Sequence, residues 1–412
     1  MTMAEPGMVI IGAGEAGTGA ATALREGGWT GPIALIGEET HPPYERPPLS
    51  KAVMLADGEP VLPLIGHGDR FAELSITYLA GARVTAIDRA AKTVRLDDDR
   101  ALPYAKLLLA TGARPRRMMI EGDEALLYLR SFSDALAIRS KLGPGRRLVV
   151  IGGGFIGLEL AASARQRGAS VTVVEAAPRI LMRGVPARLA DGLAERHRTA
   201  GVDLRTGVDI ARIEPGDASH GVWLADGSRI EADCVVAGIG ATPDTALAET
   251  AGLTLDNGIA VDETLTTSDP DIMAAGDCCS FPHPLYAGRR IRLEAWRNAQ
   301  DQGSAAARAM LGAGEPFTAV PWFWSDQYDL HLQIAGLADG GATTIERDVG
   351  EGAVILFHLA ADGRLLAASG LGPIGRIAKE VRLAEKLIAR SARPDPEALA
   401  SPTFKLKSLL AA

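Results

Sequence analysis

Cysteine is scarce in this chain of 412 residues, which has only Cys234, Cys278 and Cys279 and no Cys-x-x-Cys pair. Their odd number and their spacing argue against a disulfide framework and against an iron–sulfur or zinc site built from cysteines. Adjacent cysteines rarely form a useful redox disulfide, so we expect Cys278 and Cys279 to be structural. The seven histidines are scattered without the spacing of metal ligands, and no metal site is expected.

Long apolar runs and an excess of positive charge are also missing. The first apolar run is too short for a membrane helix and no basic residue precedes it, so we expect a cytoplasmic protein without membrane association. The formal net charge of -8 argues against nucleic acid as the main partner. The content of 47% hydrophobic and 23% charged residues is typical of soluble globular proteins, and the length allows two or three domains.

A strand–helix–strand pattern occurs twice, at residues 8–36 and again at residues 147–175. In each, an apolar strand passes through a glycine-rich turn into a helix that leads to a second apolar strand. Such a unit forms a parallel strand pair with a crossover helix, so the sequence predicts an α/β fold with two Rossmann-type domains. The predicted strands are 8–12, 33–36, 147–151 and 170–175, and the predicted helices end at about residue 27 and span 155–168.

The remaining elements are predicted from shorter signals. Residues 83–88 and 93–96 are spaced like a hairpin, whereas 234–239 and 272–275 are typical of buried parallel strands. The proline-rich segment 41–48 is incompatible with a helix or a central strand. Further strands are predicted at 76–79, 203–206, 209–214 and 221–224. A smaller C-terminal α+β domain is predicted with strands at 322–324, 330–335, 353–359 and 365–371 and a helix at 374–389.

The first glycine turn contains Gly12, Gly14 and Gly17 between a strand and a helix. In a dinucleotide fingerprint, the first glycine permits the tight turn, the second lets the backbone approach a pyrophosphate, and the third lets helix and strand pack closely. The helix N-terminus then offers free N–H groups and a positive dipole end to the phosphates. Glu38 and Glu39 follow the second strand, where an acidic residue is expected to hold a ribose.

The second glycine turn, with Gly152, Gly154 and Gly157, repeats the pattern, and its second strand ends at Glu175. A carboxylate there binds a ribose 2′-hydroxyl and repels a 2′-phosphate, which favours NADH over NADPH. Arg179 and Arg183 lie nearby in the sequence and would soften that preference. Two complete fingerprints in one chain indicate electron transfer between two dinucleotides, and FAD with a nicotinamide cofactor is the usual pair.

Several other residues have both a functional and a plain reading from spacing alone. Lys51 ends a proline-stiffened stretch and is either a flavin-side cation or part of a surface loop. Glu159 lies in the first turn of the second dinucleotide helix, and it is either the partner of Lys51 or a residue that stabilises the helix. Asp277 follows an apolar strand and either binds a ribityl chain or caps a turn. Trp296, Trp322 and Trp324 either pack in the core or stack near a flavin.

Taken together, these motifs resemble those of the FAD-dependent ferredoxin reductases that serve cytochrome P450 and Rieske oxygenase systems. The resemblance is to the putidaredoxin reductase and biphenyl dioxygenase ferredoxin reductase type. The resemblance covers nearly the whole chain, and its specific motifs are Tyr-Glu-Arg-Pro-Pro-Leu-Ser-Lys at 44–51 and Trp-x-Trp-Ser-Asp-Gln at 322–327. The other matching segments are 12–17, 110–112, 152–159, 240–243, 275–277 and 294–300.

The resemblance implies a glutathione-reductase-like fold. It implies an FAD-binding domain at 1–112 and 244–318, an NAD-binding domain at 113–243 and a C-terminal domain at 319–412. Lys51 would lie near flavin N5 and pair with Glu159, and Trp322 or Trp324 would lie beside the flavin. The residues implied to bind FAD are Gly12, Gly14, Gly17, Glu38, Arg46, Lys51, Val84, Thr111, Gly112, Asp277, Glu294, Trp296 and Trp324. Those implied to bind NADH are Gly152, Gly154, Ile156, Gly157, Glu175, Arg183 and Gly240.

The implied reaction is hydride transfer from NADH to FAD, followed by single-electron transfer to an external 2Fe–2S ferredoxin. Two basic stretches would attract an acidic ferredoxin. They contain Arg289, Arg290, Arg292 and Arg297, and then Arg376, Lys379, Arg382, Lys386 and Arg390. The second stretch also contains Glu380 and Glu385, so it is equally well explained as a solvated helix face. The oligomeric state is left open.

Alternative functions differ in whether they need a reactive cysteine and in how fast they turn over. A disulfide reductase or an NADH oxidase needs a reactive cysteine near the flavin, and the chain has none before Cys234. A rubredoxin reductase or another reductase with an external acceptor remains an alternative. So does a redox-responsive signalling flavoprotein resembling apoptosis-inducing factor, which would turn over slowly.

Overall fold

The computed structural model describes residues 5–66 and 69–410, and it divides into two compact units. The first unit comprises Met1–Glu45, Pro63–Arg114 and Thr242–Ala319. The second comprises Arg46–Leu62, Pro115–Ala241 and Val320–Ala412. The three-domain division by function stays a prediction, because these units reflect compactness rather than cofactor binding.

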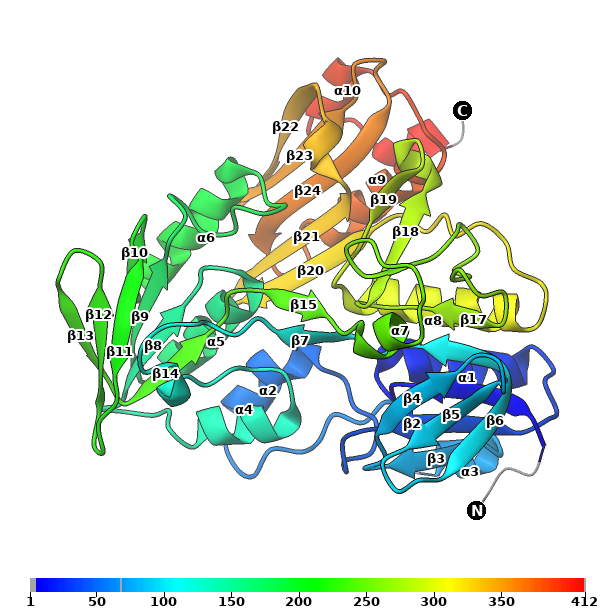
Figure 1. The fold of residues 1–412 in the computed structure, drawn as a ribbon. Helices are drawn as coiled ribbons and strands as arrows, with labels where there is room; N and C mark the ends of the chain where they lie inside the picture. Colours follow the sequence, from blue (N-terminus) through cyan, green and yellow to red (C-terminus); the bar gives the residue numbers. More distant parts are fainter. Residues whose placement is uncertain (1–4, 67–68, 411–412) are drawn as a thin grey trace. The chain divides into compact units, whose positions relative to one another are not determined.

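The first unit is built on a mixed sheet in the order β3-β2-β1-β6-β5-β4, with β17 paired to β6. Figure 1 labels the strands β2 to β6 of this sheet. β1 pairs in parallel with β2 and β6, and β17 also runs parallel to β6. β4 and β5 form the predicted antiparallel hairpin. The strands are β1 (Gly7–Ile11), β2 (Ile33–Gly37), β3 (Thr77–Ala80), β4 (Val84–Asp88), β5 (Thr93–Leu96), β6 (Ala101–Leu109) and β17 (Ile272–Ala274).

Two helices of the first unit, α1 (Glu15–Glu26) and α8 (Trp296–Met310), pack tightly against each other. A Cβ atom on Gly303 would lie 2.3 Å from the carbonyl oxygen of Ala16, so the absence of a side chain at Gly303 sets how closely the helices approach. A smaller sheet contains β16 (Ile259–Ala260), β18 (Cys279–His283) and β19 (Arg289–Ile291). α8 was not predicted from the sequence.

The second unit contains a parallel sheet in the order β10-β9-β8-β14. Its strands are β8 (Arg147–Ile151), β9 (Ser170–Glu175), β10 (Asp203–Thr206) and β14 (Cys234–Ala237), and its helices include α4 (Phe132–Arg139), α5 (Phe155–Gln166) and α6 (Ala187–Thr199). The prediction of a second βαβ unit and of a buried parallel strand at Cys234 is therefore confirmed. A separate antiparallel sheet contains β11 (Ile210–Glu214), β12 (His220–Leu224) and β13 (Arg229–Ala232).

The C-terminal part of the second unit is an antiparallel sheet in the order β20-β21-β24-β23-β22, with α9 against β21 and β24 (Figure 1). Its strands are β20 (Trp322–Gln327), β21 (Leu330–Gly336), β22 (Thr343–Gly350), β23 (Ala353–Leu359) and β24 (Leu365–Pro373). The predicted α+β character is confirmed. The strand β22 was missed because it is largely exposed and lacks an apolar run.

Two predictions about helices were wrong. The helix expected from residue 374 begins only at Ala378, as α9 (Ala378–Ala389), because β24 extends to Pro373 and a turn follows it. The segment 41–48 was expected to exclude helix, but a 3-10 helix, η1 (Pro47–Ser50), begins inside it. Proline is tolerated in the first turn of a helix, where its missing N–H has no partner to lose.

Candidate functional site

Glycine is needed at different positions of the first turn for different steric reasons. Gly12 has a φ of 109°, and a Cβ atom there would lie 2.1 Å from the carbonyl oxygen of Ala110. A Cβ atom on Gly17 would lie 1.9 Å from the carbonyl oxygen of Gly12. At Gly14 a Cβ atom would meet no described atom within 4 Å, so this glycine borders open space. The outer two glycines close the turn, and the middle one leaves room for a ligand.

The N-terminus of α1 faces that open space without a cap. Gly14 is the N-cap residue, and no described side chain bonds to it as a cap. The first N–H groups of a helix lack intrahelical partners and carry the positive end of the helix dipole. A pyrophosphate fits this arrangement, as expected for a dinucleotide turn.

The second turn has the same construction within the second unit. Gly152 has a φ of 106°, and a Cβ atom there would lie 2.5 Å from the carbonyl oxygen of Gly238. A Cβ atom on Gly157 would lie 2.4 Å from the carbonyl oxygen of Gly152. Gly154 is the N-cap residue of α5, and no described side chain bonds to it as a cap. Ile156 in the first turn is 50% exposed. Each unit thus contains an uncapped helix N-terminus after a glycine turn, the kind of site that suits a phosphate.

Glu175, at the end of β9, is held in a fixed orientation beside the second turn. Its Oε2 accepts a hydrogen bond from the N–H of Gly153 at 2.6 Å, and its Oε1 accepts one from the N–H of Ala177 at 2.7 Å. The Arg179 guanidinium donates to carbonyl oxygens of its own loop, so it is committed locally. Arg183 Nη1 lies 3.7 Å from the position of a Cβ atom on Gly240.

The acidic residues after β2 also differ from each other. Glu39 accepts a hydrogen bond from the hydroxyl of Tyr44 at 2.5 Å. Glu38 is 55% exposed, with its carboxylate 3.4 Å from the guanidinium of Arg114. Of the two, Glu38 keeps the more open carboxylate and remains the candidate for a ribose.

A buried ion pair joins Lys51 to Glu159 in the second unit. Lys51 Nζ lies 2.7 Å from Glu159 Oε2, which also accepts a hydrogen bond from Ser50 Oγ at 2.6 Å. Ser325 Oγ donates to the other oxygen, Glu159 Oε1, at 2.6 Å. Glu159 is 6% exposed and Lys51 is 22% exposed, so the carboxylate is enclosed while the ammonium reaches the surface of its unit. The structure thus contains the contact that spacing could not establish.

Aromatic rings line the strand that carries Ser325. The rings of Trp322 and Trp324 stack with their centroids 5.4 Å apart. The ring centroids of Phe323 and of Phe155 on α5 lie 4.2 Å apart. Next to them, Asp326 Oδ1 lies 2.5 Å from His331 Nδ1. Burial raises the pKa of Asp326, but the hydrogen bond and charge of His331 and the charge of Lys51 outweigh burial and leave this pKa below its usual value.

Other predicted FAD-binding residues of the first unit are held by local contacts or lie within regular elements. Thr111 Oγ1 donates to the carbonyl oxygen of Asp244 at 2.6 Å, and Gly112 has a φ of 73°. Arg292 Nη1 bonds the carbonyl oxygen of Asp277 at 3.1 Å and Glu294 Oε1 at 2.7 Å. Trp296 begins α8, whereas the Val84 side chain is buried in the sheet. In the second unit, Arg46 donates to the carbonyl oxygen of Arg130 at 2.6 Å.

Glu15 is a candidate site residue that the sequence reasoning missed. It directly follows Gly14, and its Oε1 accepts a hydrogen bond from Gln300 Nε2 at 3.3 Å. Burial raises the pKa of Glu15 to about 7, the charge of Glu45 adds to this shift, and hydrogen bonds from Trp296 and Gln300 oppose it. The signal in the sequence was a carboxylate between the second and third glycines, where a phosphate is expected.

Three of the arginines predicted to attract a partner have neighbours within the first unit. Arg290 pairs with Asp256 at 3.4 Å and Arg297 with Asp301 at 3.7 Å. The Arg289 guanidinium lies 5.6 Å from the ring of Tyr286. These acidic neighbours offset part of the positive charge that a count of arginines suggests.

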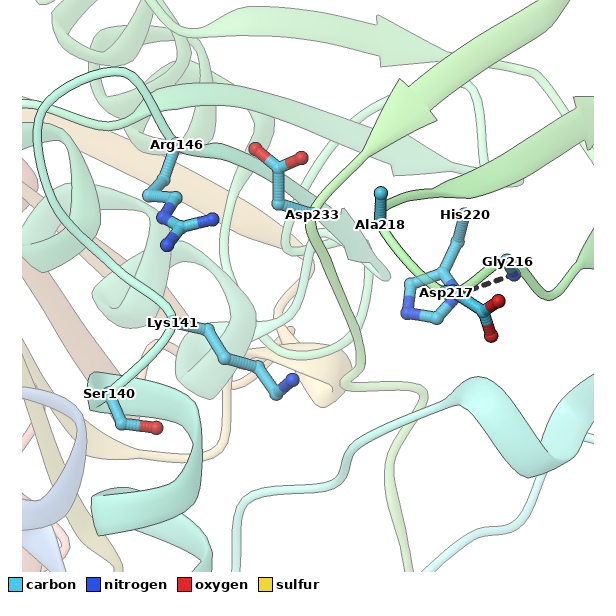
Figure 2. Close-up of a pocket in the computed structure, with 8 residues that line it drawn as sticks. All are labelled: Ser140, Lys141, Arg146, Gly216, Asp217, Ala218, His220 and Asp233. Carbon is cyan, nitrogen blue, oxygen red and sulfur yellow. Dashed lines mark hydrogen bonds between the residues drawn. The ribbon is translucent and has the colours of Figure 1, made fainter.

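A polar pocket of the second unit contains none of the predicted site residues. Its volume is about 280 Å³. Figure 2 shows the residues that line it, which are Ser140, Lys141, Arg146, Gly216, Asp217, Ala218, His220 and Asp233. Asp233 is bound by Arg147 at 2.6 Å, and Gly216 N donates to His220 Nδ1 at 3.4 Å. The pocket therefore has no part in the predicted dinucleotide sites.

The three cysteines are buried within their units. Burial raises the pKa of the Cys234 thiol to about 11, and it also raises the pKa of Cys278 and Cys279. Separately, no helix in the described ranges is long and apolar enough to cross a membrane.

Comparison with known proteins assigns this geometry to a family. Residues 6–303 match the family described as pyridine nucleotide-disulphide oxidoreductase, and residues 322–410 match a reductase C-terminal family. The chain is 41% identical over 405 residues to the ferredoxin–NAD(+) reductase component of the anthranilate 1,2-dioxygenase system of Burkholderia cepacia, covering 98% of each chain. It is 38% identical to the putidaredoxin reductase of Pseudomonas putida, covering 99% of this chain and 98% of that protein.

Solved structures agree with these relatives. The chain superposes with a TM-score of 0.92 and 38% identity on the reductase of a covalent putidaredoxin reductase–putidaredoxin complex, covering 99% of each chain. It superposes with a TM-score of 0.93 and 37% identity on the ferredoxin reductase for the CYP199A2 system of Rhodopseudomonas palustris, covering 99% of this chain and 100% of that chain. The predicted glutathione-reductase-like fold is confirmed, and the chain belongs to the pyridine nucleotide-disulphide oxidoreductase family, among its FAD-dependent ferredoxin–NAD(+) reductases.

Proposed function

We propose that the chain carries electrons from NADH through FAD to a 2Fe–2S ferredoxin that serves a cytochrome P450 or a Rieske oxygenase. The observation that carries this proposal is the pair of glycine turns, one in each unit, each opening onto an uncapped helix N-terminus. One such turn suits one dinucleotide, and two suit a donor and a resident cofactor. The ferredoxin reductases to which the chain is 36–41% identical support the acceptor.

FAD would be held first by the α1 turn. Gly12, Gly14 and Gly17 would admit its pyrophosphate, and Glu38 would accept from its ribose. The remaining proposed contacts come from the resemblance and the local geometry above: Arg46, Lys51, Val84, Thr111, Gly112, Asp277, Glu294, Trp296 and Trp324. Bound FAD supplies the conversion of a two-electron hydride donor into single-electron steps.

NADH would be held by the α5 turn. Gly152, Gly154 and Gly157 would admit its pyrophosphate, with Ile156, Arg183 and Gly240 around it. Glu175 would accept from the 2′-hydroxyl of the ribose. The two backbone N–H groups that already bind its carboxylate fix its position, so the same charge would repel a 2′-phosphate.

Lys51 and Glu159 would stabilise the negative charge of the reduced flavin and would form no covalent bond with it. A flavin gains negative charge when it is reduced, and a cation already in position stabilises that charge without reorganising. Glu159 holds the Lys51 ammonium at 2.7 Å, which limits the orientations that the lysine can adopt. Most of the remaining rate gain would come from orienting the nicotinamide ring.

The partner would be an acidic ferredoxin. The basic residues Arg289, Arg290, Arg297, Arg376 and Lys379 are the proposed docking positions, and charge complementarity there would raise the association rate. One of the similar structures is a covalent complex of a putidaredoxin reductase with putidaredoxin, which supports a small redox protein as the partner.

Reduction of ferredoxins tests the function directly. The purified protein should be yellow, bind FAD and be reduced by NADH, and it should reduce cytochrome c quickly only when one small 2Fe–2S ferredoxin is added. Equal rates with rubredoxin would assign a different acceptor. Slow turnover with every acceptor and a change of oligomeric state on reduction would point to a signalling flavoprotein. A colourless protein that takes up no FAD would remove the proposal.

A further inference from the structure

A line of buried polar side chains runs from the Lys51–Glu159 pair to α6, all within the second unit. Ser325 Oγ, which donates to Glu159, accepts a hydrogen bond from Gln327 Nε2 at 3.1 Å. Gln327 Oε1 lies 2.8 Å from His197 Nε2, and the Tyr328 hydroxyl lies 3.3 Å from His197 Nδ1. Ser325, Gln327 and His197 are at most 1% exposed, so bulk water does not replace these bonds.

The bonds of this line all donate toward Glu159. The Gln327 carbonyl oxygen can only accept, so His197 Nε2 carries the proton and Nδ1 accepts from Tyr328. Burial lowers the pKa of His197, the charge of Arg196 adds to this shift, and the Gln327 hydrogen bond opposes it; the ring is neutral at neutral pH. Burial raises the pKa of Tyr328 to about 12, against the charges of Arg196 and Arg165, so its hydroxyl keeps its proton.

The orientation of Gln327 decides where the Ser325 proton points. With the amide as observed, its nitrogen donates to Ser325 Oγ, and the Ser325 hydroxyl is left to donate to Glu159 Oε1. A flipped amide would present its oxygen to Ser325 and draw that proton away from Glu159. The flip would also require the His197 proton to move to Nδ1, so that Nε2 could accept from the amide, and it would leave the buried Glu159 Oε1 without its Ser325 donor.

We propose that His197 is a positioning residue for the Lys51–Glu159 pair, because it fixes the Gln327 amide and so directs the Ser325 hydroxyl onto Glu159 Oε1. The other oxygen, Oε2, then remains for Ser50 and Lys51. This inference rests on the proposed function, in which the Lys51 ammonium stabilises the charge of reduced flavin. A side chain on α6 that contacts no reacting atom thus sets how firmly that ammonium is held.

The chain offers a matched control for replacing a buried histidine. His358 on β23 is 5% exposed, bonds Thr344 and Ser369, and has a pKa that burial lowers to about 4. It lies in the same unit but outside the Glu159 line. The replacements His197→Phe and His358→Phe therefore remove the same groups from comparable surroundings.

The test measures the midpoint potential of bound FAD and the rate at which NADH reduces it. We expect His197→Phe to lower the potential and to slow reduction about fivefold, the loss expected for about 1 kcal/mol of hydrogen bonding. The change should have the direction of a Lys51→Met variant and be smaller. His197→Gln, whose amide can donate to Gln327 Oε1, should restore most of both values, and His358→Phe should leave both as in the wild type.

Two outcomes would overturn the inference: wild-type potential and rate in His197→Phe, or an equal shift in His358→Phe. If His197→Phe does not fold, Ser325→Ala breaks the last bond of the line, and wild-type values in that variant would overturn it as well. Failure of the wild-type protein to bind FAD or accept electrons from NADH is a different result, because it removes the proposed function itself.

Discussion

At the scale of single residues, Glu15 places a titrating carboxyl where a phosphate is expected. Its raised pKa of about 7 leaves it mostly neutral below that pH and ionised above it. As a carboxylate it would repel the FAD pyrophosphate at the N-terminus of α1. The ordinary pKa of a glutamate is 4.5, and the pKa of the folded Glu15 is about 7. Between these two pH values the unfolded chain loses this proton before the folded protein does, so the free energy of unfolding of the apoprotein falls as the pH rises.

The replacement Glu15→Gln tests this. We expect FAD affinity of the wild type to fall about fivefold between pH 6 and pH 8, as for about 1 kcal/mol of repulsion between partly screened charges, and to be nearly constant in Glu15→Gln. Fluorescence titration of the apoprotein with FAD measures both. Glu26→Gln is the control, because Glu26 lies exposed at the far end of the same helix. Identical pH profiles in all three proteins would refute the role of Glu15.

Glu175 carries the second residue-scale prediction. Glu175→Gln removes the charge that opposes a 2′-phosphate, while keeping the shape of the side chain beside Gly153. We expect the ratio of kcat/KM for NADH over NADPH to fall by about tenfold, which corresponds to about 1.4 kcal/mol. Steady-state ferricyanide reduction with each cofactor measures it. An unchanged ratio would show that this carboxylate does not discriminate between the two ribose forms.

At the scale of elements, the contact between α1 and α8 depends on one missing side chain. Gly303→Ala would force a Cβ atom to within 2.3 Å of the Ala16 carbonyl oxygen, and we expect it to lower the free energy of unfolding by about 1–3 kcal/mol. Gly19→Ala in α1 is the control, because its Cβ atom would come no closer than 3.8 Å to the Gln300 carbonyl oxygen. That variant should gain about 0.5–1 kcal/mol from reduced chain entropy. Urea denaturation of both apoproteins would contradict the packing argument if the two changes had the same sign.

Elements with a short-range signal were predictable. The two glycine turns, the strands beside them and the β4–β5 hairpin were identified because their periodicity and turn chemistry are local. β22 was missed because its exposed strand residues show no apolar run, and the start of α9 was placed too early because a turn separates it from β24. The Lys51–Glu159 contact was implied only by resemblance, since 108 residues separate the two side chains. The His197 line joins three distant segments, and no spacing rule connects them.

At the scale of the whole molecule, charge sets the expected behaviour toward a partner. The chain has a formal net charge of -8, so an acidic ferredoxin would be repelled overall and attracted only locally. We expect ferredoxin-dependent cytochrome c reduction to slow by about threefold or more between 50 and 300 mM NaCl, as salt screens the local attraction. NADH–ferricyanide activity, which needs no protein partner, is the internal control. A ferredoxin rate that stays level or rises with salt would exclude docking on the arginine positions.

The burial of every cysteine has a practical consequence. Each thiol is enclosed and reluctant to ionise, and alkylating reagents and peroxides attack the thiolate. The folded protein should therefore behave toward maleimides as though it had no cysteine at all. A single cysteine introduced on its surface would become a unique attachment point for a spectroscopic probe or for crosslinking a redox partner. The three native cysteines would not have to be removed first.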